Sequence, residues 1–529
     1  MIPQVSATAG QRNAVGRHDR PAPLSAETRR ALLLTLPFFC VVALGTVYHE
    51  LWRDEWQTWM LARDSASVAD LLRNMRHEGH PPGWYLILFG LSRFTRSAAA
   101  MQTFHVAVAT ASVFLLARYS PLSWVQKVLL AFGYFFVYEY AVIARSYALT
   151  VLALFTFCAL FPQRQRHPFA LTGSLALLAV VSVYSLIIAI AASAMLLLER
   201  VVNGGRWNSW WIRSARSRLV IIVWVAVAAA AIVIMRPPQG FSGRAANGVQ
   251  AFSKWDIAET TSSVAWAYLP VPDVTSRHPW NTHIVPKGGR VRLAVRLALS
   301  LGLLTGAALL LAGRPFVLFM YALGTIGLLL FQHLFFAGTL RHHGHLFVLF
   351  IGCLWLSRLP GRQWRLPPRL LRHTAGAPAG DAFITVLLVV HCMAAAFLYT
   401  ADMRQPFSAA PQVARLIDER GLHDLPLAVS PAPAGSSIAG VLDRPVYYVA
   451  KQSAGTFIRW GEYARPWDTH LTMRRLRPFI DEARSDVLII LGEPFDEWDD
   501  DLSVAELGRF EPGLEHREGY IVYRVAGGS

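Results

Sequence analysis

Charge and cysteine are both scarce in this sequence of 529 residues. Charged residues make up 16% and hydrophobic residues 54%, with a mean hydropathy of +0.36. This balance excludes an ordinary soluble globular chain. All four cysteines, Cys40, Cys158, Cys353 and Cys392, lie within apolar runs. They are predicted to be small buried hydrophobic residues, so the sequence indicates neither a disulfide framework nor a cysteine metal site.

The sequence contains several long apolar runs. Several are long enough to cross roughly 30 Å of hydrocarbon as helices, and they lack the alternation of barrel strands. We therefore predict an α-helical membrane domain over 31–400 with about eleven spans. They are placed at 31–48, 98–117, 124–142, 147–161, 169–182, 184–198, 218–235, 293–312, 315–336, 345–357 and 382–400.

Basic residues predict which side of the membrane each loop faces. The formal net charge is +16, and arginines gather in the short connections between the predicted spans. This is the pattern of cytoplasmic loops, and it does not indicate nucleic-acid binding. It holds only if Pro82–Phe94 lies along the interface without crossing. Residues 1–30 then form a disordered cytoplasmic tail, whereas loops 49–97 and 236–291 lie outside.

The composition changes after residue 400. The last part of the chain has 14 basic and 20 acidic residues, a net charge of −6, against +22 for the rest. Short β-branched or aromatic segments alternate there with two helical ones, which predicts a small extracytoplasmic α/β domain over 401–529. The expected strands are Leu427–Ser430, Val446–Val449, Asp486–Leu491 and Tyr520–Val525, and the expected helices are Gln412–Arg420 and Leu471–Ala483.

The first outer loop contains the residues that are best suited to catalysis. Asp54 and Glu55 stand between Trp52 and Trp56, close to the predicted membrane surface. Arg145 and Arg341 lie at span ends on the same side. A carboxylate can take a proton from an attacking hydroxyl, and convergent arginines can hold a departing phosphate. A solvated helix end is the plain alternative for an acidic pair. A second carboxylate, Glu139, lies within a predicted span near its outer end, where a carboxylate suggests a functional role; an ion pair with Arg145 is the simpler explanation.

Three short motifs resemble the GT-C glycosyltransferases, multi-span enzymes that use polyprenyl-phosphate sugars. The likeness is to their protein O-mannosyltransferase and aminoarabinose-transferase branch. The motifs are Asp54-Glu55, the segment His80-Pro81-Pro82-Gly83-Trp84-Tyr85, and Ala144-Arg145-Ser146-Tyr147. The turn Arg341-His342-His343-Gly344-His345 stands where the family has a basic residue that contacts phosphate, although it departs from the family's arginine-tyrosine form.

The resemblance implies specific roles. Asp54 would be the catalytic base, and Glu55 would assist it or bind sugar. Contacts to the donor phosphate or the substrate would come from Arg145, Arg341, His80, His342, His345, Tyr147, Trp84 and Tyr85. No metal or other cofactor is expected, although His342, His343 and His345 with His80 or Glu50 leave a divalent metal open. A plain aromatic belt is the alternative reading for the tryptophans and Tyr85.

The function expected from these features is that of an inverting glycosyltransferase of the inner (plasma) membrane. It would move a sugar from a polyprenyl-phosphate donor to a hydroxyl of a lipid, glycan or protein on the extracytoplasmic side. An oligosaccharide ligase of the same fold is one alternative. A lipid or solute transporter is another, but a transporter places polar groups along broken helices near the midplane, whereas these spans are almost free of charge.

Overall fold

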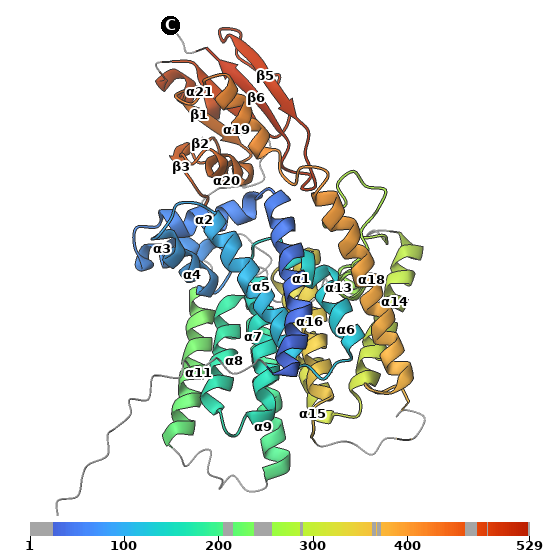
Figure 1. The fold of residues 1–529 in the computed structure, drawn as a ribbon. Helices are drawn as coiled ribbons and strands as arrows, with labels where there is room; N and C mark the ends of the chain where they lie inside the picture. Colours follow the sequence, from blue (N-terminus) through green and yellow to red (C-terminus); the bar gives the residue numbers. More distant parts are fainter. Residues whose placement is uncertain are drawn as a thin grey trace, which may run out of the picture.

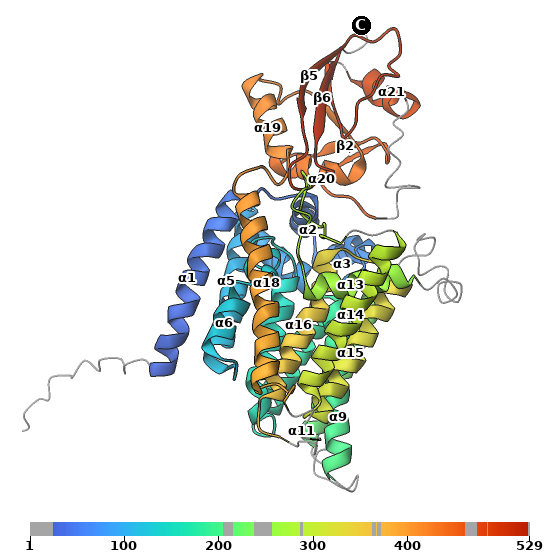
Figure 2. The same cartoon turned by 90° about the vertical axis from the view of Figure 1, so that its right-hand side faces the viewer.

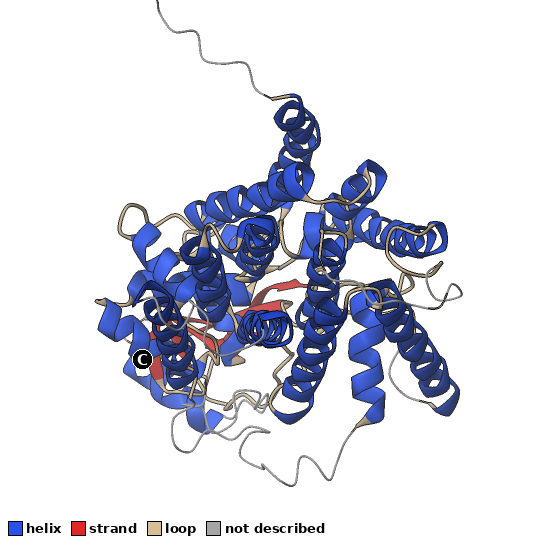
Figure 3. Cartoon of the chain, turned by 90° about the horizontal axis from the view of Figure 1, so that it is seen from below, coloured by secondary structure: helices blue, strands red, loops and turns tan. Residues whose placement is uncertain are grey.

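The computed structural model describes residues 25–204, 215–236, 256–285, 289–361, 367, 372–460, 473–483 and 485–526. Most of the predicted cytoplasmic tail, residues 1–24, lies outside these ranges. A bundle of helices makes up the larger part, and a domain built on a sheet stands on one end of it (Figures 1 and 2). Figure 3 views the bundle from the opposite end, with the strands of the sheet lying beyond the helices.

Six of the described helices are long and apolar enough to cross a membrane. They are α1 (Ala26–Tyr48), α5 (Ala99–Tyr119), α9 (Val183–Gly204), α14 (Arg290–Leu311), α15 (Pro315–Leu334) and α18 (Pro378–Asp402). The shorter helices of the bundle are α6 (Trp124–Ala131), α7 (Tyr147–Leu160), α8 (Pro168–Val181), α11 (Ala215–Ile234) and α16 (Leu340–Ser357). Every predicted span therefore contains a helix, while the count of about eleven crossings stays a prediction.

Two segments differ from the predicted pattern. The run at 124–142 is not one helix, because α6 ends and a π turn, η2 (Phe135–Glu139), follows after Gly133. Within the predicted loop 236–291, α13 (Ile257–Tyr268) is a helix whose second half is buried. It packs against α14 and α16, so this part of the loop belongs to the bundle.

The first outer loop folds into short helices at the end of the bundle (Figure 1). They are α2 (Arg53–Asp64), α3 (Val68–Asn74), the 3-10 turn η1 (Met75–His77) and α4 (Gly83–Ser92). The ten residues of α4 extend about 15 Å at the rise of an α-helix, half the thickness of the hydrocarbon. This length is consistent with a helix that does not cross.

The C-terminal domain is a six-stranded sheet with the order β3-β2-β1-β4-β6-β5. The predicted strands are present as β1 (Leu427–Ser430), β2 (Val446–Tyr448), β4 (Val487–Leu491) and β6 (Tyr520–Val525), and the predicted helices as α19 (Ala410–Glu419) and α21 (Met473–Glu482). The sequence patterns missed β3 (Ser453–Gly455), β5 (Val504–Phe510) and α20 (Ala432–Val441).

Alternate residues of the central strands face opposite layers of helices. Val429 and Ile490 share a core with Ile438 of α20, whereas Ala428 and Ile489 share one with Ile480 of α21. This alternation follows from the two-residue period of a strand. The C-terminal domain is thus a sheet covered on both faces.

Helix α20 packs directly against α2, so the C-terminal domain rests on the first outer loop. A Cβ atom at Gly440 would lie 2.2 Å from the ring of Trp56, so the two helices approach at a distance that only glycine permits. Gln57 accepts hydrogen bonds from Ser436 Oγ at 2.9 Å and from the Ile458 backbone at 3.0 Å. The loop that bears the acidic pair is therefore held between the bundle and the C-terminal domain.

Candidate active site

The first turn of α2 carries Asp54 and Glu55. The backbone N–H of Trp52, just before the helix, donates to Glu55 Oε2 at 3.3 Å. Acidic side chains in this turn are favoured by the positive end of the helix dipole. Successive residues of a helix project about 100° apart around its axis, so the two carboxylates point into different surroundings.

Asp54 points toward arginines from distant parts of the chain. Arg341, in the first turn of α16, donates from Nη2 to Asp54 Oδ2 at 2.7 Å. Nη2 of Arg145, just before α7, lies 4.0 Å from the same oxygen, and Arg53 Nε lies 3.8 Å from Oδ1. Burial raises the pKa of Asp54, but the charges of Arg341 and Arg145 outweigh it and lower the pKa. The carboxylate is therefore ionised at neutral pH.

Both arginines keep buried N–H groups that no described residue accepts. Arg145 donates from Nη1 to the Asp54 carbonyl at 2.5 Å and to Thr58 Oγ1 at 3.0 Å, but its Nε has no acceptor in the described ranges. The same is true of Nε and Nη1 of Arg341, whose guanidinium lies 4.7 Å from the ring centre of Trp52. An unsatisfied buried donor costs about 1–3 kcal/mol. Forked donors of this kind match an anion such as phosphate.

Tyr147, His342 and His345 form an aromatic wall near Arg341. The ring centre of Tyr147 lies 5.0 Å from that of His345 and 5.9 Å from that of His342. The Tyr147 side chain interacts with Arg145, whereas His345 Nε2 is buried without a partner among the described residues. In contrast, His342 Nδ1 accepts from the Thr339 backbone at 2.9 Å. His342 therefore caps the start of the helix that carries Arg341.

The segment after η1 brings His80 within electrostatic range of Asp54 and Arg145. Burial and the charge of Arg145 lower the pKa of His80 to about 3, so its imidazole is neutral. Trp84 and Tyr85 lie deeper, each 2% exposed. Trp84 packs on Phe104 and His105, and the Tyr85 hydroxyl donates to Glu78 at 3.0 Å. Trp84 thus belongs to the packing of the loop, whereas Tyr85, like His80, lies within electrostatic range of Asp54 and Arg145.

Glu55 is fully buried, and both of its oxygens accept hydrogen bonds. The Ala144 backbone donates to Oε1 at 2.6 Å, and His49 Nε2 lies 3.0 Å from Oε2. His49 Nδ1 in turn lies 2.9 Å from Asp402 at the end of α18. Burial lowers the pKa of His49, but the charges of Asp402 and Glu55 outweigh it and raise the pKa, so a cation lies between two carboxylates. Glu55 thus fixes the backbone next to Arg145 and leaves no oxygen free for a substrate.

The predicted ion pair between Glu139 and Arg145 is wrong. Glu139 Oε2 instead accepts from the Tyr134 hydroxyl at 2.5 Å and from Trp280 Nε1 at 3.0 Å. Sequence reasoning also missed His49, Asp402 and Trp280. Asp402 is an acidic residue at the end of a span, which could have drawn attention to it, whereas nothing local marks His49 or Trp280.

Within the described ranges, no group of three or more His, Cys, Asp or Glu side chains has the arrangement of a metal site. Glu50, a candidate ligand in the sequence analysis, accepts a hydrogen bond from the Phe407 backbone at 2.7 Å. Arg341, Arg145 and Arg53 surround Asp54 with N–H donors that suit an anion.

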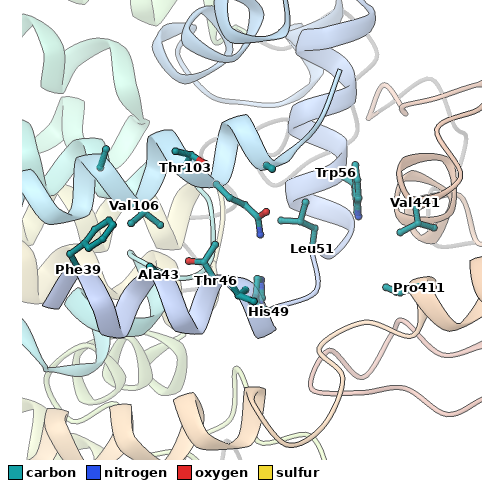
Figure 4. Close-up of a pocket in the computed structure, with 14 residues that line it drawn as sticks. Phe39, Ala43, Thr46, His49, Leu51, Trp56, Thr103, Val106, Pro411 and Val441 are labelled. Atoms are coloured by element: carbon teal, nitrogen blue, oxygen red, sulfur yellow. The ribbon is translucent and has the colours of Figure 1, made fainter. Parts of the chain in front are cut away.

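A lateral pocket of about 540 Å³ lies between α1 and α5, beneath the C-terminal domain (Figure 4). Its walls are mostly apolar, and its outer end is formed by His49, Leu51, Trp56, Pro411 and Val441. None of Asp54, Arg145 and Arg341 lines it. Trp56 is two residues beyond Asp54, or about 200° around the helix axis, so the pocket lies on the other side of α2.

Comparisons with known proteins give a distant likeness in structure. No family model matches the chain, and no curated protein matches it. A solved structure, that of ArnT from Cupriavidus metallidurans in the apo state, is similar at 13% sequence identity and a TM-score of 0.49. The match covers 94% of this chain and 98% of that one.

Proposed function

We propose that this protein is a membrane glycosyltransferase that transfers a sugar from a polyprenyl-phosphate donor to an acceptor hydroxyl. One observation carries the proposal: an ionised, partly exposed Asp54 lies against two arginines whose remaining buried N–H groups have no acceptor among the described residues. A base beside an anion site is what displacement of a phosphate leaving group requires.

The reaction balances as a single displacement. The acceptor oxygen bonds to the anomeric carbon, the bond from that carbon to the phosphate oxygen breaks, and the acceptor proton passes to Asp54. The phosphate leaves with the electron pair and is held by Arg145 and Arg341, with Tyr147 and His345 as further contacts. The configuration inverts, because the sugar is attacked once, from the face opposite the leaving group. Glu55 positions this machinery and does not touch the substrate.

The ion pair with Arg341 makes Asp54 a weak base in the free enzyme. A carboxylate with a lowered pKa cannot ionise an alcohol beforehand, so it accepts the proton only as the new bond forms. Donor phosphate competes with Asp54 for the Arg341 guanidinium. Binding of the donor would thereby free the oxygen that must take the proton.

The site lies where the helical bundle meets the C-terminal domain. We place this end of the molecule on the extracytoplasmic side of the inner membrane, because the arginine-rich connections lie at the other ends of the predicted spans. A lipid-linked donor would approach within the membrane. The acceptor would be a lipid, glycan or protein outside the cytoplasm.

Asp54→Asn tests the proposal. The amide keeps the size of the side chain but cannot take the proton, so turnover should fall by about 10²-fold or more. The measurement is sugar transfer by purified, detergent-solubilised protein, with donor binding and thermal unfolding followed in parallel. Asp424→Asn, an exposed carboxylate of the C-terminal domain, is the matched control and should behave as wild type. Retention of more than about a tenth of the activity by Asp54→Asn would rule out a base at this position.

A further inference from the structure

In the sheet of the C-terminal domain, β1 has a parallel partner on each side, so the order in which the chain adds strands reverses at β1. From β1 the chain passes through α20 to β2, which pairs with β1 in parallel on one side. After β3 and α21 it returns as β4, which pairs with β1 in parallel on the other side. In open sheets of this kind, ligands bind outside the carboxyl ends of the two strands at such a point.

A cleft of about 370 Å³ lies at this place. Ser430 and Pro431 follow β1 in its wall, and Gly492 and Glu493 follow β4. A Cβ atom at Gly492 would lie 2.9 Å from Pro431 Cδ, so the two strand ends approach closely at this point of the wall. One wall residue comes from outside the C-terminal domain: Arg53, the residue before Asp54. The cleft therefore lies between the sheet and the candidate active site.

The polar groups of this cleft are mainly basic. Arg53 and Arg517 line it together with His516. Arg517 Nε donates to His516 Nε2 at 3.1 Å and lies 3.9 Å from Glu515, and the side chain remains 48% exposed. The carboxylate in the lining is Glu493, which is exposed. Phe495 and four prolines, Pro431, Pro433, Pro494 and Pro512, give the apolar surface. Such a cleft combines an anion site, an acceptor of hydroxyl protons and flat apolar walls.

We propose that the switch-point cleft binds an anionic carbohydrate as the acceptor of the transfer reaction. Arg53 and Arg517 bind its phosphate or carboxylate, Glu493 accepts from a sugar hydroxyl, and the prolines and Phe495 contact the ring. The role of the bound sugar as acceptor rests on the function proposed above, whereas the binding of the sugar does not. It gives the C-terminal domain the task of presenting the acceptor.

The two sides of Asp54 support this division. Arg341 and Arg145 approach its Oδ2, whereas Arg53 approaches Oδ1 at 3.8 Å. An anion held by Arg145 and Arg341 would thus lie nearer to Oδ2, and an anion held by Arg53 and Arg517 nearer to Oδ1. A base that takes a proton from one substrate while the other loses its phosphate needs this arrangement.

The test is binding, measured by calorimetry on the full-length protein in detergent. The probes are glucose 6-phosphate, galacturonate and neutral glucose, and the variants are Arg517→Gln and Arg509→Gln. Arg509 is an exposed arginine on β5 that donates to Glu506 at 3.0 Å, outside the cleft. We expect at least one charged sugar to bind more tightly than glucose. Arg517→Gln should weaken that binding about 10-fold or more, the loss of one charge-assisted bond, and Arg509→Gln should leave it unchanged.

Each outcome of the binding experiment either supports or overturns the proposed sugar site. Preference for glucose 6-phosphate or for galacturonate identifies the anion as phosphate or carboxylate, and both support the cleft. Equal binding of glucose, or charged-sugar binding insensitive to Arg517→Gln, overturns it. Phosphate bound only at Arg145 and Arg341 would respond to Arg341→Ala and not to Arg517→Gln. An error in the catalytic assignment shows in the transfer rate of Asp54→Asn, and an error in this inference shows in the sugar binding of Arg517→Gln.

Discussion

Two adjacent carboxylates in the first turn of α2 have opposite surroundings. Glu55 is fully buried, and its two oxygens accept from the Ala144 backbone, the Trp52 backbone and His49. Asp54 is partly exposed and lies against arginines that keep donors without described acceptors. A carboxylate whose acceptors are all used holds structure together, whereas one beside unsatisfied donors is arranged for a ligand.

The largest expected effect distinguishes Glu55, as a residue that holds the structure, from Asp54, as a residue that acts on the substrate. In Glu55→Gln an NH₂ group replaces one of two oxygens that accept hydrogen bonds, and His49 loses a charge partner. Breaking a buried pair of this type costs about 3–5 kcal/mol. We expect a clear drop in the thermal unfolding temperature of Glu55→Gln, whereas Asp54→Asn should lose turnover and keep its unfolding temperature. Glu497→Gln, an exposed side chain, serves as the control. The comparison fails if Glu55→Gln unfolds like wild type.

Next in size are the two arginines that would hold the departing phosphate. Removing one donor to a developing anion costs roughly 10²–10³ in rate. Arg145→Ala and Arg341→Ala should each lower turnover by about this factor, in protein that is still produced and folded. Steady-state transfer kinetics with saturating donor measure it. A wild-type rate would remove the residue concerned from the site.

A third prediction concerns Glu518, which joins the C-terminal domain to α2. Its Oε1 accepts from the Arg53 backbone at 2.6 Å and its Oε2 from Ser437 Oγ at 3.0 Å. Burial raises the pKa of Glu518 to about 7, although the charge of Arg53 opposes this. The folded state therefore prefers the protonated form, so stability should fall as pH rises from about 4.5 to about 7, by at most about 3 kcal/mol.

The check for Glu518 is unfolding measured across this pH range in wild type and Glu518→Gln. Glutamine resembles the protonated acid, so the variant should lose this part of the pH dependence. Identical slopes in the two proteins would show that Glu518 does not titrate there.

The smallest effect is expected at the rim of the same interface. Arg63 Nη1 lies 2.7 Å from Asp443, and Arg96 Nη2 lies 2.9 Å from it, but the Asp443 side chain is 53% exposed. Ion pairs of this kind contribute less than about 1 kcal/mol. Asp443→Asn should therefore change the unfolding temperature and the turnover little. A loss as large as that of Glu55→Gln would mean that the rim, and not the buried contacts, holds the domain.

The sequence located the helical runs and the outer loop because both signals are local. Apolar length marks a span, and the order of Asp54, His80, Arg145 and Arg341 along the chain is readable without a structure. The sequence placed Arg341 and Asp54 at span ends on one side of the membrane, but it did not predict their direct pairing, 287 residues apart. The three hydrogen-bond partners of Glu55 could not be predicted, because two of them are backbone groups and the sequence does not show that Glu55 is buried.

The errors in the C-terminal region have similar causes. Helix α20 consists mostly of small residues, so it shows no apolar stripe, yet this smallness lets Gly440 meet Trp56. Strand β5 has Glu506 and Arg509 at exposed positions and lacks a continuous apolar run. The short edge strand β3 depends on its antiparallel pairing with β2. Each element is defined by its neighbour rather than by its own residues.

The link from His49 to Asp402 spans 353 residues, and it joins the end of α1 to the end of α18. The two ends of the long membrane part of the chain thus lie together, next to the turn that carries Asp54. The C-terminal domain begins a few residues after Asp402, already beside the surface it covers. A short tether of this kind gives millimolar effective concentrations, so docking need not be strong by itself. The C-terminal domain therefore stays beside the candidate active site.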